Sequence, residues 1–143
     1  MQQNLKHLKL ASIGVIALAV ATMLDLISAI FFGSGSDMAG APENVVLATE
    51  IFAIVISGLL LLPQVYVGVK GLLIAKNPNS SKLHIILAAI VFVISALNLL
   101  SSVIGLLTKN GEGTGISGLL LYVLDVAVYF DYIKYARIVA KEN

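Results

Sequence analysis

Long apolar segments separated by short polar ones form the basic pattern of this chain. The clearest is 51–69, nineteen uncharged residues between Glu50 and Lys70, which as a helix reach about 30 Å, one hydrocarbon thickness of a bilayer. Three further apolar segments are also long enough to span. The pattern therefore predicts four transmembrane helices, at about 10–32, 45–75, 83–107 and 116–138.

The connections between these segments are short and rich in Gly, Pro, Asn and Ser, as turns between antiparallel helices require. The composition, 59% hydrophobic and 12% charged residues, is far from that of a soluble domain. We therefore expect an all-α membrane protein in which residues 1–143 form a single integral membrane domain. The expected architecture is a four-transmembrane-helix antiparallel bundle.

An internal repeat is a further hypothesis. Shifted by 73 positions, the first segment aligns with the third without a gap, so that Leu24–Ser28 falls on Leu97–Ser101. The second and fourth segments share the run ISGLLL at 56–61 and 116–121, at a different shift. A duplication would give two equivalent hairpins, whereas apolar helices built from few residue types also align by chance. Both explanations stay open.

Basic residues predict the orientation. Eight of the nine Lys and Arg residues lie on the side of the two termini and the middle connection, and Lys109 alone lies on the other side. Cytoplasmic loops carry the excess of basic residues in membrane proteins. We therefore expect a multi-pass protein of the cell membrane with both termini in the cytoplasm.

Polar side chains within the apolar segments predict which faces point inward, because a polar group in hydrocarbon needs a partner. In the third segment, small and polar residues follow one stripe: His84, Ala88, Val91, Ser95, Asn98, Ser102 and Gly105. Each other segment has a similar stripe, which in the fourth segment comprises Tyr122, Asp125, Tyr129 and Tyr132. From these stripes we expect a polar bundle interior, with these candidate ligand-binding residues: Asp25, Glu50, Gln64, Asn98, Ser102, Tyr122, Asp125 and Tyr129.

Two aspartates lie well inside the predicted spans. Asp25 is about 10 Å from the end of its helix, and Asp125 is near mid-depth. In a functional interpretation they help to form a cavity for a proton, a hard cation or a cationic solute. In a structural interpretation Asp25 pairs with Asn98, and Asp125 with a tyrosine, to hold the helices together. Of the other candidates, Glu50 also fits an interfacial position, and Tyr129 also fits an aromatic belt with Tyr66, Tyr132 and Tyr135.

Several function classes find no support in the sequence. The chain has no cysteine, hence no disulfide and no thiolate metal site, and the motifs GxxxxGK, HExxH and GxSxG are absent. A net charge of +1 gives no reason to expect nucleic acid as a partner. We therefore expect no enzyme activity, no cofactor and no metal site.

Two function classes remain. The favoured one is a non-enzymatic accessory or interaction component, whose partners are the lipid bilayer and either further copies of itself or a larger membrane protein. The alternative is a small proton- or cation-linked transporter or channel that uses Asp125 and Asp25 as an oligomer. The first is favoured because a sparse polar interior needs no transport to explain it.

Overall fold

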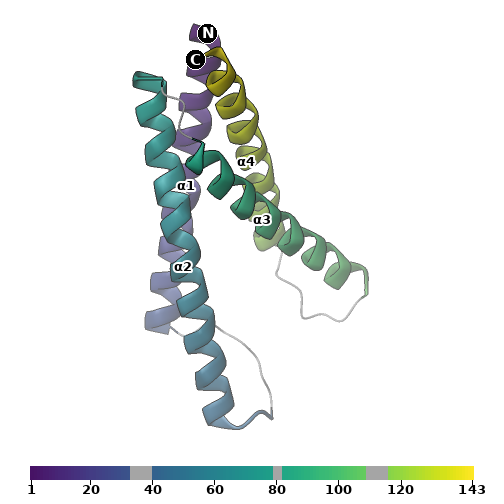
Figure 1. Ribbon diagram of the computed structural model, residues 1–143. Helices are drawn as coiled ribbons and strands as arrows, with labels where there is room; N and C mark the ends of the chain where they lie inside the picture. The colour runs from purple at the N-terminus through teal and green to yellow at the C-terminus, as the bar shows by residue number, and fades with distance from the viewer. Residues whose placement is uncertain (33–39, 79–81, 109–115) are drawn as a thin grey trace.

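The computed structural model describes residues 1–32, 40–78, 82–108 and 116–143. It contains the helices α1 (Gln2–Phe32), α2 (Glu43–Lys76), α3 (Leu83–Leu107) and α4 (Ile116–Glu142) (Figure 1). Over these described ranges the predicted all-helical fold is confirmed. Most of the first and third predicted connections, including Lys109, lie outside the described residues, as do residues 79–81 of the second.

α2 matches its predicted bounds to within two residues, but two other helices extend further beyond their predicted ends. α1 begins at Gln2, eight residues before the predicted start, and α4 ends at Glu142, four residues after the predicted end. Contacts between the two extensions explain the difference. The Asn4 Nδ2 amide donates a hydrogen bond to Glu142 Oε1 at 2.9 Å, and the His7 ring stacks on the Tyr135 ring with centroids 4.7 Å apart. The extra turns are thus held by tertiary contacts, which hydropathy does not report.

Three of the helices, α1, α2 and α3, are long and apolar enough to cross a membrane, which indicates a membrane protein. α2 is the longest, at 34 residues or about 51 Å, and it continues through Pro63. It therefore exceeds one hydrocarbon thickness and must tilt or project. The fourth predicted span, α4, is less apolar because Asp125, Asp131 and Lys134 all lie in it.

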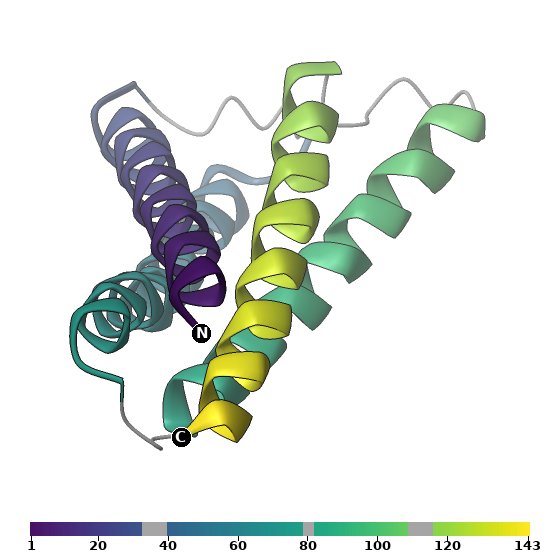
Figure 2. The ribbon, with the colours of Figure 1, turned by 90° about the horizontal axis from the view of Figure 1, so that it is seen from above.

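The helices form two hairpins, α1 with α2 and α3 with α4. The hairpins also contact each other, through α1 with α4 and through α2 with α3. Figures 1 and 2 show that the hairpins come together near the chain termini and diverge away from them. We call these two ends of the molecule the terminal end and the open end. All four helices therefore pack together only near the terminal end.

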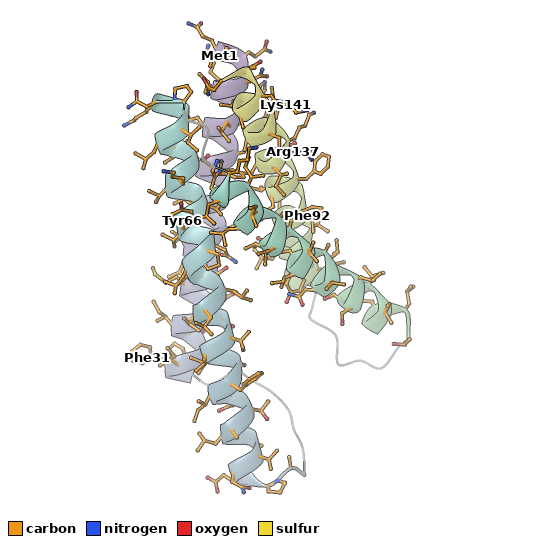
Figure 3. All side chains as sticks on the ribbon, viewed as in Figure 1. Met1, Phe31, Tyr66, Phe92, Arg137 and Lys141 are labelled. Carbon is orange, nitrogen blue, oxygen red and sulfur yellow. The ribbon has the colours of Figure 1, made fainter. Side chains whose placement is uncertain are left out.

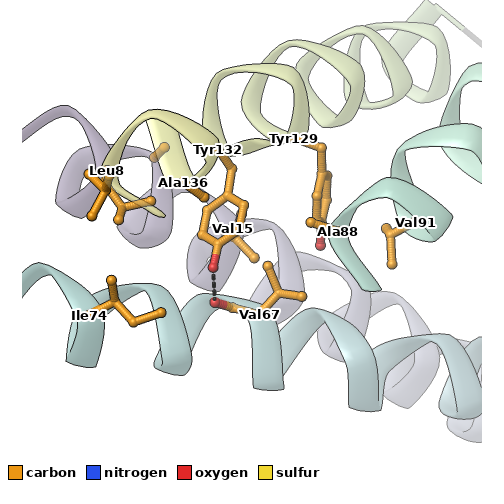
Figure 4. Close-up of a cluster of buried hydrophobic side chains, with 11 residues drawn as sticks. Leu8, Val15, Val67, Ile74, Ala88, Val91, Tyr129, Tyr132 and Ala136 are labelled. Carbon is orange, nitrogen blue, oxygen red and sulfur yellow. Dashed lines mark hydrogen bonds between the residues drawn. The ribbon is translucent and has the colours of Figure 1, made fainter. Parts of the chain in front are cut away.

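The hydrophobic core lies toward the terminal end and draws on all four helices. Its buried members include Leu8 and Val15 from α1, Val67 and Ile74 from α2, Ala88 and Val91 from α3, and Tyr129, Tyr132, Ala136 and Val139 from α4 (Figure 4). Phe92 is partly buried and packs against this cluster, whereas Phe31 lies outside it (Figure 3). Phe31 is 76% exposed, as is expected of a surface that faces lipid.

Glycines allow α2 to approach α1 and α4 closely. A Cβ at Gly68 would lie 2.6 Å from Ile16 Cγ1, and one at Gly71 would lie 2.6 Å from Tyr132 Cε2. Both distances are shorter than real Cβ contacts. A side chain at either position would therefore push the helices apart at the core.

Candidate functional site: a cavity between the hairpins

A cavity of about 340 Å³ is lined by residues from all four helices. Half of its described lining residues are aliphatic and half are polar or acidic. The lining comprises Thr22, Asp25, Leu26 and Ala29 from α1; Ala53, Ile54, Ser57, Leu60 and Gln64 from α2; Val91, Ile94, Ser95 and Asn98 from α3; and Leu121, Tyr122 and Asp125 from α4. Since both hairpins contribute, the cavity depends on their relative position.

The structure brings together five of the eight residues proposed from sequence: Asp25, Gln64, Asn98, Tyr122 and Asp125 line the cavity. The other three do not. Glu50 is half-buried and lies on α2 before the first lining residue of that helix. Ser102 is buried on α3, and Tyr129 lies in the core one turn beyond Asp125. The lining also includes Ser95, which belongs to the predicted α3 stripe, and Thr22, which sequence reasoning did not select.

The pairings of the structural interpretation are not formed. In the part of the chain that the structure describes, no hydrogen bond joins Asp25 to Asn98, or Asp125 to Tyr122 or Tyr129. Asp25 and Asn98 are both exposed, on helices that belong to different hairpins. The aspartates are therefore arranged around a space and are not bonded to the proposed partners.

The two aspartates and Gln64 lie at different heights in this space. Asp25 is seven residues from the end of α1, about 10 Å, and its exposure places it at the mouth of the cavity. Asp125 is nine residues from the start of α4, about 14 Å, and is half-buried. Gln64, only 8% exposed, is the most buried of the three and forms part of the floor.

Gln64 has an unsatisfied acceptor. Its Oε1 atom is buried and has no hydrogen-bond partner among the described residues, and the same is true of the Tyr129 hydroxyl in the core. A buried polar atom without a partner costs roughly 1–3 kcal/mol, and such atoms are rare in folded proteins. The Gln64 oxygen therefore has an unused capacity to accept a hydrogen bond.

The charged residue types in the lining of the cavity are all acidic. Two carboxylates line it, and its described lining residues include no Lys, Arg or His. Nor does the described part of the chain hold any group of three or more His, Cys, Asp or Glu side chains that would suit a metal ion. In surroundings of low dielectric constant, uncompensated carboxylates strongly favour a cation or a proton.

A polar junction beneath the cavity joins three helices. The Tyr132 hydroxyl of α4 donates a hydrogen bond to the Val67 carbonyl of α2 at 3.0 Å (Figure 4). The same oxygen lies 2.7 Å from His84 Nδ1 of α3. Because the hydroxyl has one hydrogen, which Val67 accepts, Nδ1 of His84 must be the donor.

With Tyr129 and Tyr132 both 0% exposed, the aromatic-belt interpretation of these two residues is wrong.

The fold and the cavity together define a helical membrane protein with an acidic internal cavity. No known protein family matches this chain, and neither a curated protein nor a solved structure is detectably similar to it.

Proposed function

We propose that this protein is a small cation-linked transporter or channel that binds its cation in the cavity between the two hairpins. One observation carries the proposal: Asp25 and Asp125 line a single cavity and are not hydrogen-bonded to the partners that a purely structural role requires. A charged side chain at membrane depth is costly and usually marks an ion or substrate pathway. We therefore favour a transporter or channel over the accessory or interaction component that the sequence alone favoured.

The proposed topology has four crossings, with α4 as the fourth, and both termini in the cytoplasm. Two observations support it. Met1 and Asn4 both contact Glu142, so the chain begins and ends on the same side. Arg137 and Lys141 lie near the same end (Figure 3), as the distribution of basic residues requires. The mouth of the cavity then faces the outer half of the membrane.

The proposed mechanism uses the carboxylates as exchangeable sites. A proton neutralises Asp125 when no cation is present, and an entering cation replaces it, so that the buried Asp125 is never left with an uncompensated charge. The core and the Tyr132 junction close the cytoplasmic side of the cavity. Passage therefore requires the hairpins to move relative to one another, and a second copy of the chain can cover the lateral opening between them.

The test is flux into proteoliposomes that contain the purified protein. We expect an imposed proton, sodium or potassium gradient to be dissipated faster than in protein-free liposomes, and Asp125→Asn to lower the rate at least about tenfold. Asp131→Asn is the matched control, because Asp131 lies on the same helix, is exposed and does not line the cavity. If the parent protein dissipates none of the three gradients, and adding an organic ammonium ion does not change this, the transport proposal fails.

An accessory or interaction component is the second candidate, and the open end favours it. Asp25 and Asn98 are exposed there, where only lipid or a partner can cover them. A partner helix in this opening would shield Asn98. The two candidates differ in one measurement: a cysteine at Asn98 would react more slowly in native membranes than in purified protein if a partner covers it, and equally fast if none does.

A further inference from the structure

We propose that the cation is a small organic ammonium ion, whose N–H groups are bound by the Asp125 carboxylate and the Gln64 amide oxygen. This inference rests on the proposed function and names the substrate class of the same cavity. The residues that carry it are on facing helices of the two hairpins, α4 and α2.

Gln64 supplies the observation that points to a donor ligand. Its side chain is 8% exposed and lines the cavity, and its Oε1 atom has no partner within the described chain. An amide oxygen can satisfy only a hydrogen-bond donor. An ammonium group has up to three donors, so it can bond to this oxygen and to a carboxylate at the same time.

The lining favours an organic ion over a bare metal ion. Leu60, Ile94 and Leu121 give the cavity aliphatic walls, which match an apolar body. A hard metal cation takes about six to eight oxygen ligands, and the described residues hold no group of three acidic or histidine side chains that would suit it. A volume of about 340 Å³ also lies within the range of small-molecule sites, roughly 300–1,000 Å³.

The three polar groups suggest a path into the site. Asp25 is exposed and attracts the cation at the mouth, while the buried Gln64 fixes the ammonium group at the floor. Asp125 lies between these extremes of burial and supplies the compensating charge. We therefore expect Asp125 and Gln64 to set the affinity at equilibrium, and Asp25 mainly the rate of association.

The experiment is calorimetric titration of the full-length protein in detergent micelles, with titration into empty micelles subtracted. The probe is benzylammonium, and benzyl alcohol is the matched ligand because it keeps the ring and lacks the charge. We expect saturable binding of benzylammonium alone. Asp125→Asn and Gln64→Leu should each raise the dissociation constant by about tenfold or more, and Asp131→Asn should change it by less than about twofold.

The outcomes separate this inference from the proposed function. If benzyl alcohol binds as well as benzylammonium, the cavity is only an apolar pocket and the inference is overturned. If sodium or potassium ions bind and benzylammonium does not displace them, the substrate class is wrong but cation binding stands. If no cation binds, both proposals fail. Circular dichroism and gel filtration check that each variant is folded, and the comparison of ligands on the parent protein needs no variant.

Discussion

At the scale of single residues, Tyr132 connects more of the structure than any aspartate does. Its hydroxyl joins the Val67 carbonyl of α2 to the His84 ring of α3, and its ring fills the space that Gly71 leaves open. The sequence pattern predicts that Tyr132 is on the inward stripe of α4. It does not predict the bond to Val67, because a backbone carbonyl carries no signal in the sequence.

Removing the Tyr132 hydroxyl should destabilise the fold. Tyr132→Phe removes the hydroxyl that contacts the Val67 carbonyl and His84 Nδ1 in a buried site, so we expect a loss of about 1–2 kcal/mol in the free energy of unfolding. Chemical denaturation in detergent micelles measures it. Tyr66→Phe is the control, since Tyr66 is 38% exposed. Equal stability of both variants would show that the junction contributes nothing.

The close approach at Gly71 gives a second prediction. Gly71→Ala places a Cβ 2.6 Å from Tyr132 Cε2, so α2 and α4 must separate, and we expect a loss of about 1–3 kcal/mol. Gly58→Ala in the same helix is the matched control, because its nearest neighbour, Leu26 Cδ2, is 4.0 Å away. Thermal unfolding of both variants provides the comparison. A Gly71→Ala melting temperature at or above that of Gly58→Ala would contradict the close packing.

The stripe on α3 shows how much of the site the sequence contains. Its five buried residues, His84, Ala88, Val91, Ser95 and Ser102, all belong to the stripe predicted from spacing. Asn98 belongs to the same stripe but is exposed. Periodicity identifies the inward face of a helix, but it does not report that the hairpins diverge at this height. The cavity follows from that divergence, so its exact lining could not be predicted.

At the scale of the helix, α4 is the element that depends most on its neighbours. On the membrane-insertion scale an aspartate at the helix centre costs about 2.5–3.5 kcal/mol, whereas leucine contributes about −0.3 to −0.6. Asp125 lies close to the middle of α4, while α1, α2 and α3 are apolar enough to span without help. α4 is therefore expected to insert weakly when it is isolated from the other three.

This expectation is testable by the insertion of an isolated α4 segment into microsomes, scored by glycosylation of its flanks. Asp125→Leu should make the apparent free energy of insertion about 3–4 kcal/mol more favourable. Asp131→Leu should have a smaller effect, because Asp131 lies near the inner end of the apolar run 116–133, whereas Asp125 lies near its middle. Equal effects of the two substitutions would mean that Asp125 is not at mid-depth.

The ends of α1 and α4 mark the limit of prediction for elements. Hydropathy places the start of the first helix at residue 10, where the apolar run begins, but the helix starts at Gln2. The preceding residues are mostly polar. They continue the helix because Leu8 enters the core and Asn4 bonds to Glu142, and such contacts exist only once the fold has formed.

At the scale of the whole molecule, the topology has a direct test because the chain contains no cysteine. Asn44 and Asn77 are exposed at opposite ends of α2. In intact cells, Asn44→Cys should react with a membrane-impermeant thiol reagent, whereas Asn77→Cys should react only after the cells are permeabilised. The reverse pattern would place both termini outside.

The duplication stays a prediction. Its proposed equivalents, Asp25 on α1 and Asn98 on α3, are both exposed and both line the cavity, one from each hairpin. Shared placement is what a duplication would give, and it is also what two hairpins around any common space would give. Equal effects on flux of substitutions at Asp25 and Asn98 would favour the duplication, since chance similarity predicts no such equivalence between the two residues.

Because the two hairpins are firmly packed only at the terminal end, they can rotate about that end as about a hinge. A rotation of about 10° at the junction moves points about 30 Å away by about 5 Å, while few side-chain contacts are broken at the separated tips. The pressure of the surrounding acyl chains then acts on the gap between the tips. The separation of the hairpins should therefore depend on bilayer thickness, and it should change with the length of the lipid tails around the protein.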